Sequence, residues 1–179
     1  LIKGTGVGSE SSLHQDWNIV DESKYASAAI FCPLIDVNEF NGCLKVISGS
    51  HKWFNNIRSF QYPSPYLSFD EVGDGIVSFP AKAGDAVVFR HNVIHGSNNN
   101  ISKENRIAAS MSITSKDAQR IHFILQNDSF ATIKAEENFF CNVVPSLYEG
   151  KQVDFEFLNK TPYTLDHVST HEDFLKKYG

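Results

Sequence analysis

Two short segments of the sequence place a histidine two residues before an acidic residue, a spacing that suits metal binding. One pair is His14 and Asp16, and the other is His171 and Asp173. Residues i and i+2 of a β-strand point to the same face, so both side chains of such a pair could bind one ion. The second pair lies in a charged tail with no later histidine, and we interpret it as part of a solvated terminal helix. The first pair, which precedes many strand-like segments, is the candidate metal site.

A site of this kind needs a third ligand further along the chain. Two imidazoles and one carboxylate leave about three positions open on a six-coordinate metal, the arrangement of non-haem Fe(II) oxygenases, in which a co-substrate and dioxygen bind together. The segment 84–97 offers His91 and His95. A glycine, a serine and three asparagines follow His95, so we place it at the end of a strand, whereas His91 lies inside the run. This favours His95 and leaves His91 as the alternative; either could instead be a hydrogen-bonded core histidine.

Arg106 is a candidate for binding a carboxylate. It begins a strand-like run in which Ala108, Ser110 and Ser112 share its face. A buried arginine above small and hydroxyl-bearing residues suits a dicarboxylate, because the guanidinium can form two parallel hydrogen bonds with one carboxylate and leave space for the carbon chain. The alternative is an exposed arginine on the solvent face of a half-buried strand.

The elements that must position these residues are mostly strands. Apolar, β-branched and aromatic residues occur in short runs separated by Gly, Asn, Asp and Pro, a pattern typical of an all-β sandwich or barrel. The runs are 28–37, 43–47, 75–79, 85–89, 106–114 and 121–125. The sequence therefore predicts an all-β core with a few short helices.

Turns, helices and one long loop are predicted between and after these runs. The Asn-Gly pair at 41–42 and the segment 83–85 follow apolar runs and contain residues that tolerate the positive φ of a hairpin turn. Short helical patterns occur at 21–25 and 171–178. The segment 52–72, which contains two prolines, is predicted to be a long irregular loop.

Length and charge exclude several classes of protein. The 179 residues are enough for one compact core, and we predict a single domain over residues 1–179. Sixteen Lys and Arg against 21 Asp and Glu give a net charge of −5, so neither nucleic acid nor an anionic membrane surface is an expected partner. No segment approaches the length of a membrane helix, and no secretory signal is recognisable.

The cysteines indicate the cellular compartment of the protein, and the first residue indicates whether the sequence begins at the natural N-terminus. Cys32, Cys43 and Cys141 are odd in number and far apart, which indicates neither a disulfide framework nor a zinc knuckle. We therefore expect a protein of the reducing cytoplasm. Because the sequence opens at Leu1, directly on a strand-like run, we also expect an N-terminal piece to be missing.

Four landmarks in the sequence resemble the phytanoyl-CoA dioxygenase family, and they occur in the family's order. They are the His14-Gln15-Asp16 segment, the segment 41–52 with its Gly49-Ser50-His51, the segment 84–97, and Arg106. The resemblance implies a double-stranded β-helix, a jelly roll of the cupin type. It also implies an enzyme that uses Fe(II), 2-oxoglutarate and O2 to hydroxylate a small molecule, with release of succinate and CO2.

Carried over position by position, the resemblance implies roles for five residues. His14, Asp16 and His95 would be the iron ligands. Arg106, eleven residues after His95, would bind the 5-carboxylate of 2-oxoglutarate, and Ser97 would help to hold the same co-substrate. Halogenases related to the family replace the carboxylate with a small residue, so the presence of Asp16 favours hydroxylation.

The sequence departs from the family at two points. Ser48 stands where the family usually has proline before Gly-Ser-His, and the largely helical N-terminal portion of the family is absent. Phe31 falls near an aromatic position that often lines the family's pocket. Because no basic cluster suits the phosphates of coenzyme A, the expected substrate is a free small metabolite.

Two other functions are open on the residues alone. A non-catalytic β-sandwich that binds a ligand would contain the same histidines incidentally and would bind no stoichiometric metal. A zinc hydrolase could use the same two histidines and carboxylate, but it leaves Arg106 unexplained and needs a general base that the sequence does not identify.

Overall fold

The structure, a computed structural model, describes most of the chain. The described residues are 1–53, 57–59, 75–126, 129–136, 139–149 and 156–162. Within these ranges no helix is both long enough and apolar enough to cross a membrane.

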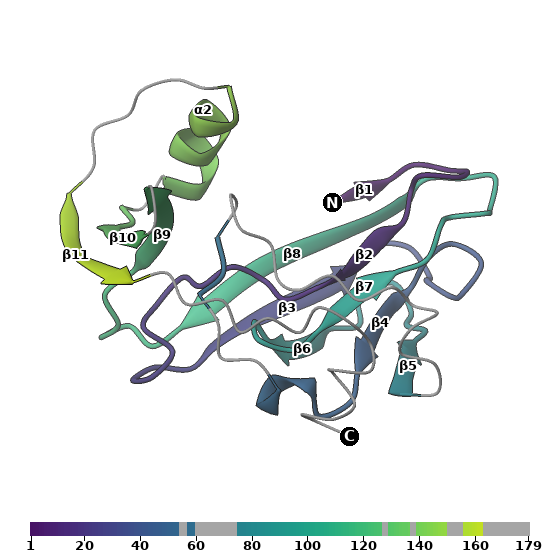
Figure 1. Ribbon diagram of the computed structural model, residues 1–179. Helices are drawn as coiled ribbons and strands as arrows, with labels where there is room; N and C mark the ends of the chain where they lie inside the picture. Colours follow the sequence, from purple (N-terminus) through teal and green to yellow (C-terminus); the bar gives the residue numbers. More distant parts are fainter. Residues whose placement is uncertain (54–56, 60–74, 127–128, 137–138, 150–155, 163–179) are drawn as a thin grey trace, which may run out of the picture.

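The first of three antiparallel sheets carries its strands in the order β1-β8-β3-β6. The strands are β1 (Ile2–Lys3), β3 (Ser27–Pro33), β6 (Val87–Arg90) and β8 (Arg106–Thr114). β3 and β8 pair along the whole length of β3 and form the middle of this sheet (Figure 1).

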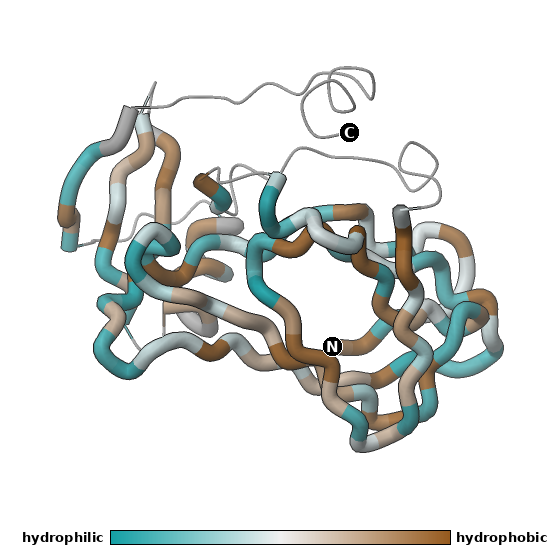
Figure 2. The backbone as a smooth tube through the Cα atoms, turned by 90° about the horizontal axis from the view of Figure 1, so that it is seen from below, coloured by the Kyte–Doolittle hydropathy of each residue, from teal (hydrophilic) through white to brown (hydrophobic). Residues whose placement is uncertain are grey.

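The second sheet has the strand order β2-β7-β4-β5. Its strands are β2 (Ser11–His14), β4 (Leu44–Ile47), β5 (Ile76–Phe79) and β7 (His95–Ser97), and the 3-10 helix η1 (Ser50–Lys52) follows β4. The rings of Phe89 on β6 and His95 on β7 lie 4.6 Å apart, so the two sheets pack face to face. Figure 2 shows their backbone running round a ring. Two facing antiparallel sheets are the predicted jelly-roll architecture.

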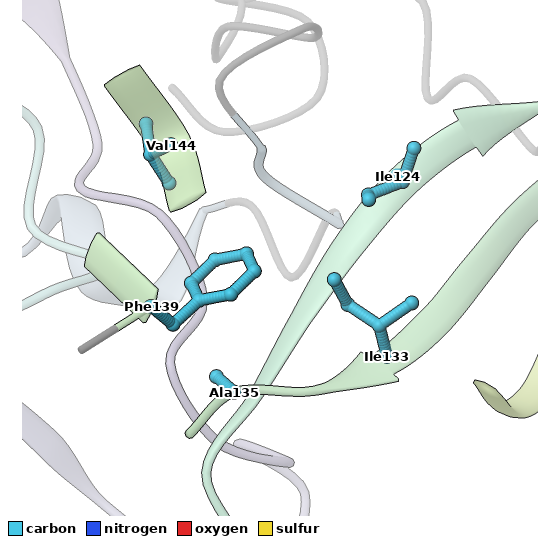
Figure 3. Packing of buried hydrophobic residues seen from close by; sticks show 5 residues of the cluster. All are labelled: Ile124, Ile133, Ala135, Phe139 and Val144. Atoms are coloured by element: carbon cyan, nitrogen blue, oxygen red, sulfur yellow. The ribbon is translucent and has the colours of Figure 1, made fainter. Parts of the chain in front are cut away.

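A third sheet, β11-β10-β9, lies at one end of the other two (Figure 1). It consists of β9 (Ile121–Gln126), β10 (Ser129–Lys134) and β11 (Phe157–Pro162), and the π-helix η3 (Phe139–Val143) and α2 (Val144–Tyr148) belong to the same region. Strands and helices share an apolar core of Ile124, Ile133, Ala135, Phe139 and Val144 (Figure 3). Trp17 packs against this core and so connects it to the segment that follows β2.

Side chains at the start of β8 alternate between buried and exposed positions. Arg106 and Ala108 are buried, whereas Ile107 and Met111 are exposed. Because residues i and i+2 share a face of a strand, Arg106 and Ala108 point between the two sheets and the apolar residues of the other face point outward. Residues 109–113 are all exposed, and Ser110 and Ser112, on the predicted face of Arg106, line a cavity, so the two faces differ in burial only at the start of the strand.

Most predicted strands are present, but the connections are not the predicted hairpins. Gly42 and Gly84 have φ values of 76° and 92°, as expected for turn residues. However, β3 and β4 lie in different sheets, and so do β5 and β6. The two turns therefore connect one sheet of the jelly roll to the other. The strands on either side of each turn do not pair with each other but with other strands of their own sheets.

The run that contains His91 and His95 is two strands, not one. β6 ends at Arg90, and the amide of Val93 donates to the Arg90 carbonyl at 2.9 Å, which closes a turn. The prediction that His95 ends a strand is wrong, because His95 begins β7. The two strands belong to different sheets, so the chain has to turn between the two histidines.

The helix predicted over residues 21–25 is a single turn in the structure. The amide of Lys24 donates to the Asp21 carbonyl at 3.0 Å, and the Asp21 carboxylate accepts hydrogen bonds from the amide and hydroxyl of Ser23. This local hydrogen bonding competes with helix, and the chain enters β3 before a second turn could form. The other predicted helix, 171–178, and most of the predicted loop, 52–72, lie outside the described residues.

Candidate metal centre

His14 and His95 lie side by side on neighbouring strands. They are direct partners in the pairing of β2 with β7, and their ring centroids are 4.4 Å apart. Nδ1 of His14 lies 2.7 Å from the carbonyl oxygen of Ser12, and Nδ1 of His95 lies 3.0 Å from that of Val93. A carbonyl oxygen only accepts, so in the neutral rings each Nδ1 carries the proton and each Nε2 keeps a lone pair for a metal ion.

Asp16 completes a cluster of three donors. Its Oδ1 lies 4.0 Å from Nε2 of His14 and 3.7 Å from Nε2 of His95. All three ligand atoms lie within 4.8 Å of one another. Two imidazole nitrogens and a carboxylate oxygen in this arrangement fit a six-coordinate ion such as Fe(II) and leave positions open for other ligands. The structure therefore brings together the three residues that the sequence suggested as a metal site.

The position of Asp16 has a different cause from the predicted one. β2 ends at His14, so Asp16 does not lie two residues along a regular strand. Instead, the amide of Asp16 donates to the carbonyl of His91 at 2.9 Å, and the carbonyl of Asp16 accepts from Nε of Arg58 at 2.7 Å. The prediction that strand alternation aligns the two side chains is wrong, because long-range hydrogen bonds hold the segment outside the sheet.

His91 lies beside the cluster but does not belong to it. Of the two histidines that the sequence left open, only His95 is among the three clustered donors of the described residues. His91 is 1% exposed, and neither of its ring nitrogens has a hydrogen-bond partner in the described part of the chain. Burial lowers the pKa of His91 and of His95 below the ordinary value. The negative charge of Asp16 raises both pKa values, but burial has the larger effect. Both rings are therefore favoured in the neutral form.

A cavity of about 780 Å³ opens next to the cluster. Its wall combines two of the three candidate ligands, His14 and Asp16, with hydroxyl groups from β8 and aromatic surface. It is lined by His14, Gln15, Asp16, Trp17, Ile19, His91, Ser110, Ser112, Thr114, Arg120, Glu136 and Phe140. A small molecule in this cavity would lie against the open side of a bound metal ion.

Arg106 is buried at the start of β8. It is 6% exposed, and its guanidinium carbon lies 5.2 Å above the centre of the Phe31 ring. Nε and Nη1 are buried without a hydrogen-bond partner in the described chain. The alternative of an exposed arginine is therefore wrong. Unpaired buried donors are costly, and burial lowers the pKa of this guanidinium, so a carboxylate ligand would stabilise it.

Lys3 and Ser97 lie at the same end of the sheets as Arg106. Lys3 is the partner of Arg106 in the β1–β8 pairing, and its Nζ donates to the carbonyl of Asn98 at 3.1 Å. Burial and the Arg106 charge lower the pKa of Lys3 to about 8. Ser97, which precedes Asn98, is buried at the end of β7. Its role in holding a co-substrate stays a prediction.

Nothing in the sequence marks Arg58 and Glu22 as neighbours of the cluster. Nη2 of Arg58 lies 2.6 Å from Oε1 of Glu22, and both side chains are buried or nearly so. Arg58 stands in the segment predicted as an irregular loop, without periodicity or a spacing motif. No local signal could have connected it to Asp16, because only the tertiary fold brings the two residues together.

Comparison with known proteins places the chain in one family. Residues 1–108 match the family described as Phytanoyl-CoA dioxygenase (PhyH). The chain is 31% identical over 123 residues to Phytanoyl-CoA dioxygenase 1 of Oryza sativa subsp. japonica, covering 63% of this chain and 42% of that protein. It is also 31% identical over 122 residues to phytanoyl-CoA dioxygenase of Arabidopsis thaliana, covering 65% of this chain and 43% of that protein. The chain thus spans less than half the length of these relatives.

The fold is similar to that of SnoK, a non-heme alpha ketoglutarate dependent carbocyclase from nogalamycin biosynthesis. The TM-score is 0.52 at 21% identity, covering 67% of this chain and 50% of that one. This likeness concerns the fold, and it confirms the predicted double-stranded β-helix. The family match includes His14, Asp16, His95 and Arg106. The chain therefore belongs to the phytanoyl-CoA dioxygenase family, which uses Fe(II) and 2-oxoglutarate.

Proposed function

We propose that the chain carries the catalytic centre of an Fe(II)- and 2-oxoglutarate-dependent dioxygenase. The enzyme uses O2 to hydroxylate a small-molecule substrate and releases succinate and CO2. The observation that carries the proposal is the cluster of His14, Asp16 and His95, whose metal-binding atoms lie within 4.8 Å of one another, two of the three residues also lining a cavity. The family match over residues 1–108 supports it.

The protein's own residues hold and orient the metal. His14 and His95 bind it through Nε2, and their Nδ1 hydrogen bonds to Ser12 and Val93 keep each ring in the required tautomer and orientation. The Asp16 carboxylate reduces the net charge of the bound ion. When bound, Fe(II) supplies the O2 chemistry that no side chain can perform.

Arg106 binds the distal carboxylate of 2-oxoglutarate. Its Nε and Nη1, which have no partner in the described chain, can donate two hydrogen bonds to one carboxylate, and the Phe31 ring limits movement of the guanidinium from below. Ser97, buried on the same strand as His95, would help to hold the same co-substrate.

The substrate is a free small metabolite with polar groups, bound in the cavity beside the cluster. Ser110 and Ser112 offer hydrogen bonds, and Trp17 and Phe140 offer apolar contact. Among the described lining residues Arg120 is the single lysine or arginine, which does not suit the several phosphates of coenzyme A. The net charge of −5 argues against nucleic acid or a membrane surface as a partner, and we place the protein in the cytoplasm.

An anaerobic titration of Fe(II) and 2-oxoglutarate into the protein tests this function. We expect the visible charge-transfer absorption of 2-oxoglutarate chelated to iron. Asp16→Ala should abolish the band, and Arg106→Ala should raise the 2-oxoglutarate concentration needed for half-saturation by about ten- to a hundredfold, since hydrogen bonds to a charged group contribute about 1.5–3 kcal/mol. Asp117→Ala and Arg90→Ala, which replace exposed residues of the same types, are the matched controls.

Two results would contradict the proposal. A protein that binds neither Fe(II) nor 2-oxoglutarate under these conditions is better described as a ligand-binding β-sandwich. A protein that binds Zn(II) at the cluster, hydrolyses a substrate and does not respond to 2-oxoglutarate is a zinc hydrolase.

A further inference from the structure

Asp16, which follows the end of β2, is held by a buried arginine distant in sequence. Arg58 is 1% exposed; its Nε donates to the carbonyl of Asp16 at 2.7 Å, and its Nη2 pairs with Oε1 of Glu22 at 2.6 Å. The backbone of Arg58 is fixed as well, because its amide donates to Oδ1 of Asn18 at 2.7 Å and its carbonyl accepts from the amide of Asn18 at 3.3 Å. Arg58 thus contacts three positions of the segment between β2 and β3.

The segment needs such an anchor because no strand pairing supports it. β2 ends at His14 and β3 begins at Ser27. On its other side, Asp16 is held by the hydrogen bond from its amide to the His91 carbonyl. Both peptide groups of Asp16 are therefore fixed by residues distant in sequence, and the direction of the carboxylate follows from the orientation of these peptides.

We propose that Arg58, together with Glu22, is a positioning residue for the metal centre. It fixes the backbone of Asp16 so that the carboxylate points at the Nε2 atoms of His14 and His95. The inference rests on the proposed function, since that function makes Asp16 a metal ligand. Arg58 acts on the cluster through Asp16, because Nε of its guanidinium donates to the carbonyl of that residue.

Arginine suits this position for a geometric reason. Its planar guanidinium donates from Nε toward Asp16 and from Nη2 toward Glu22 at the same time, whereas lysine has a single nitrogen. Glu22 also accepts a hydrogen bond from Oγ of Ser27 at 3.1 Å, so the anchor is tied to the start of β3. Glu22 neutralises the buried cation, and removing either charge alone leaves the other one buried and uncompensated.

Co(II) binding and the stability of the metal-free protein test the proposal together. The variants are Arg58→Lys, Arg58→Gln and the double variant Glu22→Gln/Arg58→Gln, which removes both buried charges. Arg58→Lys keeps a charge beside Glu22 and should retain more of the parent's Tm than Arg58→Gln. We expect Arg58→Lys and the double variant to bind Co(II) about ten- to a hundredfold more weakly than the parent, with an altered Co(II) absorption spectrum.

The control is Val37→Ala. This variant also loses stability, because Val37 is a buried apolar residue, but the backbone of Val37 bonds to Ala81 and not to Asp16. It should lower the Tm and leave Co(II) affinity and spectrum unchanged. If Arg58→Lys and the double variant also bind Co(II) with the affinity and spectrum of the parent, the proposal is overturned, and Arg58 has a structural role only.

A second measurement separates this proposal from the proposed function. If the parent protein itself binds no Co(II), the proposed function fails. Amide hydrogen exchange at Asp16 and Asn18 in the metal-free protein then decides the role of Arg58. Faster exchange in Arg58→Lys than in the parent supports the anchor, and unchanged exchange overturns it.

Discussion

At the scale of single residues, the three donors of the candidate metal centre are oriented in two different ways. Each histidine bonds through Nδ1 to a carbonyl two residues earlier in the chain, Ser12 for His14 and Val93 for His95. Asp16 depends on Arg58 and on the His91 carbonyl, both distant in sequence. Neighbouring residues in the chain thus orient the two imidazoles, whereas residues distant in sequence orient the carboxylate, so its orientation depends on the tertiary fold.

The buried ring of His91 leads to a prediction about stability. Both ring nitrogens lack a partner in the described chain, and an unsatisfied buried polar group costs about 1–3 kcal/mol. His91→Phe removes both polar atoms and can extend into the adjacent cavity. We expect the free energy of unfolding of the metal-free protein to rise by about 1–2 kcal/mol, because replacing a polar group at a functional site often stabilises a protein. Urea denaturation measures this change.

His91→Gln is the control, because it keeps a polar group at the position and should not stabilise the protein. A His91→Phe protein less stable than the parent would show that the imidazole is satisfied in solution by ordered water.

At the scale of secondary-structure elements, the third sheet is connected to the metal centre through His122. This residue of β9 is fully buried, and its ring centroid lies 5.7 Å from that of Trp17 and 5.3 Å from that of Phe139. The amide of Ile121 donates to the carbonyl of Ile19 at 2.9 Å in the same region. β9 therefore packs directly on the segment that carries Asp16.

The environment of His122 predicts how stability depends on pH. Burial lowers its pKa from 6.5 to about 4, so the unfolded chain takes up a proton at a higher pH than the folded chain. The stabilising contribution is complete above pH 6.5 and is lost as the pH falls from 6.5 to 4, by up to about 3 kcal/mol. Urea denaturation at a series of pH values measures this loss.

The variant His122→Phe isolates the contribution of this ring from that of the other buried histidines. We expect a smaller decrease in the free energy of unfolding between pH 6.5 and 4 than in the parent. An unchanged decrease would mean that other groups, such as His91, account for the acid sensitivity.

At the scale of the whole molecule, the outer face of the first sheet is apolar and exposed. Val88 of β6 is 59% exposed and Met111 of β8 is 58% exposed, and both pair with Ile30 of the strand between them. Ile107 and Ile113 extend this surface along β8. Contiguous apolar surface of this kind is uncommon on a soluble monomer.

This surface predicts binding of a hydrophobic dye. We expect the folded protein to enhance the fluorescence of ANS, and the double variant Val88→Thr/Met111→Lys to reduce the enhancement while Tm changes little, because both side chains are exposed. Val77→Thr, at an exposed position on the second sheet, is the matched control and should leave the dye fluorescence unchanged. Equal fluorescence in parent and double variant would assign the dye binding to another surface.

Much of the fold could be predicted from local pattern. The strand β8 has the predicted bounds, and β3, β4, β5, β6 and β9 lie within about a few residues of the predicted runs. β1 coincides with the strand-like run at Leu1, and β2 contains His14 of the predicted metal-binding strand but ends before Asp16, whereas β10 and β11 were not predicted. The Asn-Gly turn with Gly42 was predicted correctly, yet the pairing of its flanking strands was not, because turn chemistry is local and strand pairing is not.

The donor types, their order and the two faces of the strand that begins with Arg106 could be predicted from the residues alone. These properties depend on neighbours along the chain, through side-chain alternation and local hydrogen bonds. Three further outcomes depend on the folded chain: His95 and not His91 joins His14 and Asp16, Arg106 is buried, and Arg58 holds the backbone of Asp16. Those outcomes require strands of two sheets and a distant loop to meet, and the contacts exist only in the folded chain.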